Sequence, residues 1–415
     1  MMRILIISDH SDPLAKIGSK ESGGQNVFIY YLAKHLAKKG IKVDVFTRWD
    51  QKNKRKIVTV SPNFRVIRIK AGPKGYLARD KFLHVLDEFT KNILGFVIAE
   101  PEPYDLIHSN YWFSGLAGLE IAKKLNLPQV HVYHSIGEVR FKVLKKFKLQ
   151  KRDFFYFQKR IESEKLIAEK CTGIIATSPS EKHLLLRLFK LEPKKVPVIT
   201  IGVDRKIFFP AGQLRARKKL GLSETKKLLL YAGRIEWRKG IGTLLYSFKQ
   251  VLENYPDSKL YIIGGARTAK LKKLEQAELD RQQEIIRLLG LENRVVYAGP
   301  KTHKRLRLYY SAADVCVVPS YYEPFGIVPL EAMACGTPVV ASKTGGLGYS
   351  VKNSRSGFLA EPRNKQELAE KIIAVLRRGK ESFQQECLKE VKQKFDWEKI
   401  SMAYIKYFDQ ITKQK

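Results

Sequence analysis

The strongest constraint on the fold is an alternation of short apolar runs and helical segments that passes through the chain twice. In the N-terminal half, the runs expected to form strands are residues 3–8, 42–47, 66–69, 105–109, 129–133, 173–177 and 196–200. After a polar connection, further runs follow at residues 228–232, 259–263, 295–297, 315–319, 339–342 and 357–359. Strands that alternate with helices pair in parallel through right-handed crossovers. The sequence therefore predicts an α/β protein with two successive, doubly wound, Rossmann-like sheets.

The length of the chain agrees with this division, because 415 residues exceed what one hydrophobic core usually holds. We place the boundary near residues 205–222, so that the two domains are residues 1–205 and 206–395. The last segment, residues 396–415, is an aromatic-bearing helix that we expect to pack back on the N-terminal domain. Ligands of such sheets bind beyond the carboxyl ends of the strands. Two facing sheets therefore predict a site in a cleft between the domains.

The formal net charge of +36 is compatible with an anionic substrate, an anionic membrane surface or nucleic acid as partner. Lysines occur in almost every predicted helix, so a solvated lysine-rich surface accounts for much of this charge. A denser stretch, rich in aromatic residues, contains Arg140, Lys142, Lys145, Lys146, Lys148, Lys151 and Arg152. It fits either a helical pair packed on its domain or a face that lies on a membrane. No nucleic-acid recognition module is present, which leaves a nucleic-acid-binding protein as a minor alternative.

The cellular compartment is predicted from two absences in the sequence. No stretch approaches the roughly 18 to 20 apolar residues that span a bilayer. The first apolar run meets Asp9 after a few residues, which favours a buried strand over a secretory signal. We therefore expect a cytoplasmic protein, with peripheral contact at the inner membrane face as an alternative. The four cysteines, Cys171, Cys316, Cys335 and Cys387, lack metal-ligand spacing, so buried thiols and no metal site are expected.

Three short motifs carry the candidate chemistry, and the first is Gly23-Gly24, between the first strand and a helix expected over residues 27–39. Glycines let the backbone approach a ligand closely, and a helix N-terminus offers N–H groups to an anion. The motif is not G-x-G-x-x-G, so a nicotinamide dinucleotide site is disfavoured. On its own, the glycine pair is equally compatible with a tight turn between strand and helix.

The second and third motifs lie in the C-terminal half. The second runs from Gly233 to Gly240, where Arg234 and Lys239 would place two cations beside a helix N-terminus, as a diphosphate requires. A solvated charged turn is the alternative. The third motif has Glu323 and Glu331 eight positions apart, with a helix expected to open at Gly326. Such carboxylates suit sugar and ribose hydroxyls, although glutamates often only cap helices.

Together these motifs, with Glu331-Ala332-Met333-Ala334-Cys335-Gly336-Thr337-Pro338, resemble the retaining glycosyltransferases of family 4, which have the GT-B fold. The resemblance extends over essentially the whole chain. It implies a nucleotide-diphosphate sugar as donor, with a UDP-sugar expected, and no metal or other cofactor. The donor-binding residues that it implies are Gly23, Gly24, Arg234, Lys239, Phe325, Gly326, Ile327 and Glu331. In that family, Glu331 would hold the ribose and Glu323 the transferred sugar.

Within this family, the N-terminal half is most similar to the D-inositol-3-phosphate glycosyltransferases, with the sucrose-phosphate synthases next. The stretches that carry the similarity are 22–27, 46–48, 71–73, 108–115 and 134–135. Both kinds of enzyme use an acceptor that bears phosphate. The resemblance therefore implies an N-terminal acceptor domain, with Asn26, Lys81, Tyr111, Ser135 and Arg160 as the acceptor-binding residues. Lys, Tyr, Ser and Arg side chains are also the donors that an anionic acceptor needs.

The same resemblance places His134 near the transferred sugar, with its backbone or ring touching the 6-hydroxyl, and makes His134, Arg234, Lys239 and Glu323 the catalytic set. The expected reaction is retaining transfer of glucose or N-acetylglucosamine to a phosphorylated polyol or sugar. A lipid or lipid-linked saccharide at a membrane surface is the alternative acceptor. Three positions depart from the relatives: Gly348-Tyr349 replaces Pro-Glu, and Ser135 replaces threonine. The nucleotide base, the exact acceptor and the oligomeric state stay open.

Overall fold

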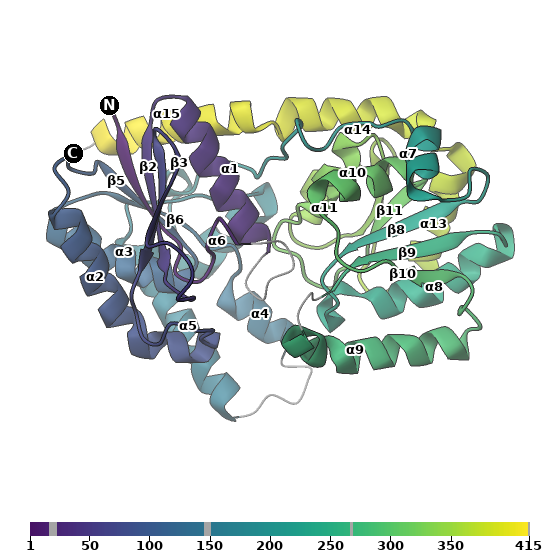
Figure 1. Cartoon of the computed structure of the whole chain (residues 1–415), viewed down its shortest axis with the longest axis horizontal. Helices are drawn as coiled ribbons and strands as arrows, with labels where there is room; N and C mark the ends of the chain where they lie inside the picture. The colour runs from purple at the N-terminus through teal and green to yellow at the C-terminus, as the bar shows by residue number, and fades with distance from the viewer. Residues whose placement is uncertain (16–22, 145–150, 266–268, 414–415) are drawn as a thin grey trace. The chain divides into compact units, whose positions relative to one another are not determined.

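The computed structural model describes residues 1–15, 23–144, 151–265 and 269–413, and it divides into two compact units (Figure 1). Among these residues, unit 1 contains 1–15, the segments between 23 and 200, and 398–413. Unit 2 contains the segments between 201 and 397. The last helix, α15 (Trp397–Lys413), begins at the end of unit 2 and otherwise belongs to unit 1.

Unit 1 is built on a seven-stranded sheet with the order β3-β4-β2-β1-β5-β6-β7. Its strands are β1 (Arg3–Ile7), β2 (Lys42–Arg48), β3 (Ile57–Ser61), β4 (Phe64–Ile69), β5 (Leu106–Asn110), β6 (Gln129–Val132) and β7 (Gly173–Ile174). All pairs are parallel except β3 with β4. The sheet grows in both directions from β1, so the switch in strand order lies between β1 and β5. In doubly wound folds, this is where ligands bind.

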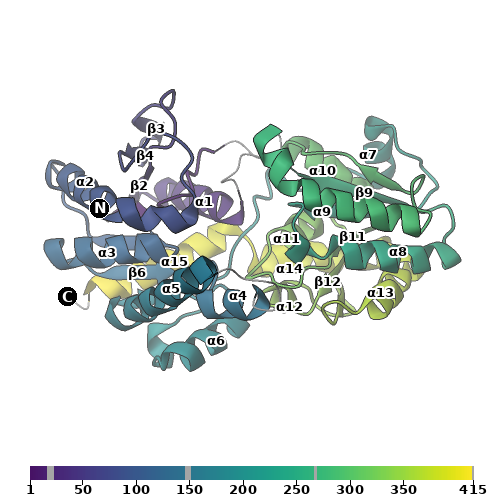
Figure 2. The same cartoon turned by 90° about the horizontal axis from the view of Figure 1, so that it is seen from below.

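Helices cover both faces of this sheet (Figures 1 and 2). They are α1 (Gly24–Lys38), α2 (Leu86–Ile98), α3 (Trp112–Leu125), α4 (Gly137–Leu144), α5 (Lys151–Lys170) and α6 (Pro179–Phe189), with short 3-10 turns η1 (Arg79–Val85) and η2 (Pro193–Lys195). Helices α2, α3 and α5 pack on one face around buried residues such as Phe89, Trp112 and Ile167. On the other face, Tyr404 of α15 packs against Phe28 of α1 and His108 of β5.

Two details of this sheet differ from the sequence prediction. Strand β3 was not predicted, because it is an antiparallel edge strand with Ile57 exposed and therefore lacks a continuous apolar pattern. Residues 196–200 were expected to be a strand but form only one isolated bridge, between Ala176 and Val198. Pro197 explains this difference, since proline lacks the N–H group that a ladder requires.

Unit 2 contains a six-stranded, all-parallel sheet with the order β10-β9-β8-β11-β12-β13. The strands are β8 (Leu228–Gly233), β9 (Lys259–Gly264), β10 (Val295–Tyr297), β11 (Val315–Val318), β12 (Val339–Ser342) and β13 (Gly357–Ala360). Counted within the unit, this is the Rossmann order 3-2-1-4-5-6, with its switch point between β8 and β11. The central strands are buried on both faces, which explains their continuous apolar runs. The prediction of two Rossmann-like domains is confirmed.

The helices of unit 2 follow its strands in the crossover pattern seen in Figure 2. They are α7 (Gln213–Leu220), α8 (Ile241–Asn254), α9 (Ala269–Leu288), α10 (His303–Ala312), α11 (Val328–Ala334), α12 (Leu347–Ser350), α13 (Lys365–Arg378) and α14 (Glu381–Lys394), with a 3-10 turn η3 (Trp237–Lys239). Among the described residues, no helix combines the length and apolar character that crossing a membrane requires.

A buried network of ion pairs joins the amino ends of β1, β2 and β4 in unit 1. Asp44 accepts hydrogen bonds from Arg3 at 2.9 Å, from Arg65 at 2.7 Å and from the Tyr104 hydroxyl at 2.6 Å. Asp44 is only 3% exposed. This network lies at the end of the sheet opposite the carboxyl ends of the strands, so its role is to hold the strands together.

Candidate active-site residues

In unit 2, the loops that follow β8 and β11 touch through their backbones at the switch point. Gly240 has a φ of +70°, and a Cβ added there would lie 2.0 Å from the carbonyl oxygen of Pro319. At the end of the neighbouring β9, a Cβ on Gly264 would lie 1.7 Å from the carbonyl oxygen of Gly233. Only glycine permits such close approach. The loop from Gly233 to Gly240 is therefore packed tightly against the loop that carries Glu323.

Lys239 and Glu323 form an ion pair across these two loops. The ammonium group contacts the carboxylate directly, and the two side chains are only 16% and 13% exposed. Burial acts to raise the pKa of Glu323, but Lys239 and Arg238 outweigh it and hold that pKa below its usual value. Burial lowers the pKa of Lys239. The sequence placed these two residues in separate motifs, and the structure brings their charged groups together.

A second carboxylate, Glu236, organises the other cations of this loop. It accepts hydrogen bonds from Arg234 at 3.2 Å and from Arg238 at 2.7 Å. Burial opposes ionisation, but Arg238 and Arg234 lower the pKa of Glu236 to about 2. The Arg234 side chain is 41% exposed, and the hydroxyl of Tyr231 donates to its backbone carbonyl at 2.7 Å. Sequence reasoning named Arg234 and Lys239 but missed Glu236 and Arg238. The signal that could have found them is the alternation of charge at every second position from residue 234 to residue 238.

The segment between Glu323 and Glu331 differs in one respect from the prediction. Helix α11 begins at Val328 rather than at Gly326, because Gly326 has a φ of +87° that is incompatible with the first turn of a helix. Glu331 lies in the first turn of α11, is buried, and accepts a hydrogen bond from the Tyr310 hydroxyl at 2.8 Å. Burial raises the pKa of Glu331 to about 7.

In unit 1, two residues just beyond the carboxyl ends of β5 and β6 have positive φ without being glycine. Tyr111 has φ 76° and ψ 157°, a region that is almost exclusive to glycine, and His134 has φ 57°. Each such conformation costs about 1 to 3 kcal/mol and persists only where the surroundings enforce it. Strained positions of this kind cluster at functional sites.

Arg160 of α5 connects these strand ends. It is fully buried and donates to Glu164 at 2.7 Å, to the Tyr111 hydroxyl at 3.3 Å and to the Ser135 hydroxyl at 3.2 Å. Burial acts against its charge, but Tyr111 and Glu164 outweigh burial and raise the pKa of Arg160. Three of the predicted acceptor residues, Tyr111, Ser135 and Arg160, therefore form one hydrogen-bonded cluster, which we call the Arg160 cluster.

Comparison with known proteins decides the family. The D-inositol 3-phosphate glycosyltransferase of Corynebacterium diphtheriae is 34% identical over 365 residues, which cover 87% of this chain and 83% of that protein. The model of group 1 glycosyl transferases matches residues 213–393, and that of glycosyltransferase family 4 matches residues 22–206. The chain is a group 1 glycosyltransferase.

Solved structures agree with this assignment. Sucrose-phosphate synthase from Thermosynechococcus elongatus superposes on the glycosyltransferase over 100% of both chains, with a TM-score of 0.90 and 35% identity. The structure of Anabaena HepE with UDP and glucose shares the fold, with a TM-score of 0.75 and 21% identity over 99% of this chain and 100% of that one. The GT-B fold and the family-level prediction are confirmed.

Outside the Arg160 cluster of the glycosyltransferase lie the predicted residues Asn26, Gly23, Gly24 and Lys81. Asn26 is buried and uses its amide locally, donating to the Asp12 carbonyl at 2.8 Å and accepting from the Gly23 backbone at 3.0 Å. Helix α1 begins at Gly24, so both glycines lie at its N-terminus. Lys81 lies exposed in η1, and no described hydrogen bond or ion pair joins it to the Arg160 cluster. The prediction for Lys81 thus rests on the resemblance alone.

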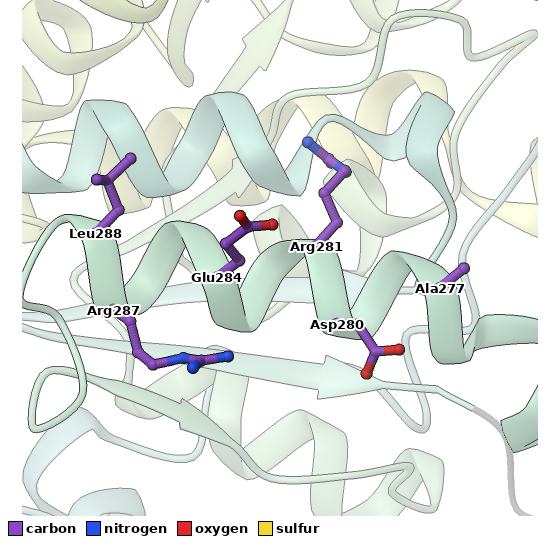
Figure 3. A pocket seen from close by; sticks show the side chains of 6 residues that line it. All are labelled: Ala277, Asp280, Arg281, Glu284, Arg287 and Leu288. Carbon is purple, nitrogen blue, oxygen red and sulfur yellow. The ribbon is translucent and has the colours of Figure 1, made fainter.

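One hollow on the surface of unit 2 is separate from these residues. It runs along α9 and is lined by Ala277, Asp280, Arg281, Glu284, Arg287 and Leu288 (Figure 3). Arg281 points toward α8, where its guanidinium would lie 2.9 Å from a Cβ on Gly242. None of the predicted site residues lines this hollow. Within the residues that the structure describes, no group of three or more His, Cys, Asp or Glu side chains could hold a metal ion.

Proposed function

We propose that this glycosyltransferase moves a glucosyl or N-acetylglucosaminyl unit from a UDP-sugar to a phosphorylated polyol or sugar, with retention at the anomeric carbon. The observation that carries the proposal is the Arg160 cluster, which holds a buried guanidinium and two hydroxyl groups at the strand ends of unit 1. Guanidinium and hydroxyl groups are donors suited to phosphate oxygens. The names of the relatives, which refer to inositol 3-phosphate and sucrose phosphate, support the same acceptor class.

The donor side of the proposal uses the switch point of unit 2. Arg234 and Lys239 would bind the diphosphate, Glu331 the ribose hydroxyls, and Glu323 the transferred sugar. The backbone of Phe325, Gly326 and Ile327 completes the donor site proposed for unit 2. The resemblance also assigns the donor to Gly23 and Gly24, which lie at the N-terminus of α1 in unit 1. Arg234 and Lys239 would supply the positive charge that a metal ion supplies to a diphosphate in other enzymes. The proposal therefore includes no metal or other cofactor.

The proposed reaction exchanges one bond at the anomeric carbon for another on the same face of the sugar. The bond from that carbon to the β-phosphate oxygen breaks, and a bond to the acceptor oxygen forms. The proton of the acceptor hydroxyl moves to the leaving diphosphate. Arg234 and Lys239 would stabilise the negative charge that develops on the diphosphate, which is the largest kind of catalytic contribution in many enzymes.

The decisive experiment incubates the full chain with UDP-glucose or UDP-N-acetylglucosamine, with and without inositol phosphate or fructose 6-phosphate, and reads products by mass spectrometry. A phosphorylated glycoside is the expected product. Free inositol and free fructose serve as matched acceptors without phosphate and should give at least tenfold less product. Equal transfer to phosphorylated and unphosphorylated acceptors would contradict the acceptor class but not the donor class.

Lys81 gives a direct test of the acceptor side. Replacing Lys81 with alanine should raise the KM for the phosphorylated acceptor by about tenfold or more, since one charge-assisted hydrogen bond contributes about 1.5 to 3 kcal/mol. The Kd of the UDP-sugar should not change. Lys91, an exposed lysine of α2, is the matched control, and Lys91→Ala should leave both constants unchanged. An unchanged acceptor KM in Lys81→Ala would remove Lys81 from the site.

Glu331 predicts how donor binding depends on pH. Its pKa of about 7 means that the carboxylate, which would accept hydrogen bonds from the ribose, is lost as the pH falls through 7. The Kd of UDP should therefore rise as the pH falls from 8 to 6 in calorimetric titrations. Glu331→Gln should bind UDP more weakly, with the pH dependence in this range reduced. An equally steep pH dependence in Glu331→Gln would assign the titration to another group.

A lipid or lipid-linked acceptor at a membrane surface is a second candidate function, and exposed aromatic side chains favour it. Phe155 is 70% exposed and Phe154 44% exposed on α5, although Phe141 packs against Phe154 and Phe157. Three lysines of the basic, aromatic-rich stretch lie outside the described residues, namely Lys145, Lys146 and Lys148. Salt-sensitive pelleting with anionic vesicles, lost in Phe155→Ser, would support this function. Pelleting no greater than that with neutral vesicles would exclude it.

A further inference from the structure

Asn110, the last residue of β5, has an amide whose orientation is fixed by its surroundings. It is fully buried at the switch point of the unit 1 sheet. Its Nδ2 atom lies 3.3 Å from the carbonyl oxygen of Ile7 in β1 and 3.4 Å from that of His108. Carbonyl oxygens only accept hydrogen bonds, so the NH₂ group must face them. The amide oxygen of Asn110 therefore points the other way.

That oxygen lies 2.9 Å from Nε2 of His134. Because an amide oxygen only accepts, Nε2 of His134 must carry the hydrogen of this bond. Burial, with His108 and His10 nearby, lowers the pKa of His134 to about 3, so the ring is neutral at physiological pH. A neutral imidazole carries one hydrogen, which leaves Nδ1 with a lone pair.

The ring of His134 is also held in position. It packs against Phe28 of α1 in an edge-to-face arrangement, with the ring centroids 5.0 Å apart and an angle of 71° between the planes. The preceding residue, Tyr133, is buried and donates its hydroxyl to the Glu164 carbonyl at 2.7 Å. Together with the left-handed backbone at His134, these contacts restrict how the imidazole can turn.

We infer that Asn110 is a positioning residue that fixes His134 in the Nε2–H tautomer, so that Nδ1 accepts a hydrogen bond from a hydroxyl of the transferred hexosyl unit. The choice of the hexosyl unit as ligand rests on the proposed function and on the family resemblance, which places His134 near the transferred sugar. The tautomer follows from the bonds of Asn110 and does not depend on that function. A donor sugar that lacks this hydroxyl would leave Nδ1 without its hydrogen bond. Asn110 and His134 would therefore also contribute to donor specificity.

The tautomer is measured directly in the wild-type full chain. Long-range ¹H–¹⁵N correlation spectra of ¹⁵N-histidine-labelled protein at pH 7.5 distinguish the two neutral tautomers, and His134→Gln identifies the signals of His134. We expect protonated Nε2 and unprotonated Nδ1. Protonated Nδ1 in the wild type would overturn the inference, whatever any variant does.

Asn110→Ser tests the role of the amide, and Ser109→Ala is its matched control. Ser109 is a buried neighbour in β5 that bonds to Gln129 and His131. Asn110→Ser should shift the His134 signals toward a mixture of tautomers, and Ser109→Ala should not. Melting curves identify a variant that does not fold, in which case the wild-type spectrum decides. Unchanged His134 signals in a folded Asn110→Ser protein would overturn the inference.

Kinetics with a series of monodeoxy UDP-glucose donors separate positioning from a general structural effect. Asn110→Ser should lower kcat/KM for UDP-glucose by about 10- to 100-fold. For the one deoxy donor that lacks the hydroxyl bound to Nδ1, the same substitution should lower kcat/KM by less than about twofold. An equal loss with every donor would contradict the proposed contact. If the wild type transfers no sugar to phosphorylated acceptors, the proposed function fails, and the spectra still decide the tautomer.

Discussion

Replacing Lys239 with alanine should lower kcat by about 10²- to 10³-fold, the loss typical of removing one fixed donor to a developing negative charge. Lys239 is held at the switch point of unit 2 by Glu323, and both side chains are largely buried. A lysine fixed in this way needs little reorganisation when charge appears on the leaving diphosphate. Steady-state rates with saturating UDP-sugar, and melting curves for the same samples, measure the loss and show that the fold is intact.

Two further variants make this prediction specific. Lys249→Ala removes an exposed lysine of α8 and should leave kcat unchanged. Glu323→Gln keeps Lys239 but removes its buried partner, so the pKa of Lys239 should fall further. As the pH is raised, the rate of this variant should therefore decline at a lower pH than the rate of the wild type. Near-normal turnover in a folded Lys239→Ala enzyme would remove Lys239 from the catalytic set.

Replacing Asp44 with alanine should lower the free energy of unfolding by about 1 to 3 kcal/mol, because the buried Arg3 and the partly exposed Arg65 each lose an acceptor while Glu100 still pairs with both. Tyr104 would also lose the acceptor of its hydroxyl. Urea denaturation followed by circular dichroism measures the change. Glu102→Gln breaks only the exposed pair with Lys42 and should leave the denaturation midpoint nearly unchanged.

The same network should weaken in acid. Burial acts to raise the pKa of Asp44, but hydrogen bonds from Arg65, Tyr104 and Arg3 outweigh it, so the folded-state pKa is lowered. A carboxylate with a lowered pKa stabilises the fold fully above its unfolded-state pKa, and this stabilisation is lost as the pH falls through the folded-state value. The difference in stability between wild type and Asp44→Ala should therefore shrink in that acidic range. A difference that is constant down to the acid transition would show that the loss reflects packing and not charge.

Much of the fold was predictable because the relevant signals are local. The central strands are buried on both faces, so their apolar runs mark them without reference to any partner. Apolar runs did not predict strands correctly where burial or hydrogen bonding depends on position in the sheet. Strand β3 is half exposed at an edge, and residues 196–200 are apolar but contain a proline.

The candidate site was predictable in residue type but not in connectivity. The sequence named Lys239 and Glu323 for separate ligand groups, and the structure pairs them across two loops. It likewise named His134, but not Asn110, whose amide reaches Ile7 and His134 from different strands. Asn26 was named for the acceptor, and in the structure its side chain bonds to Gly23 and Asp12 at the N-terminus of α1.

By itself, the sequence determined the two doubly wound sheets, the family, and the residue types at the strand ends. These follow from periodicity and short motifs, which depend on neighbours in the chain. The tertiary structure alone decided which charges are paired, which histidine nitrogen carries the hydrogen, and which residues are strained. Those properties depend on distance and burial, and crossover connections bring together groups such as Ile7 and Asn110 that are 103 positions apart in the chain.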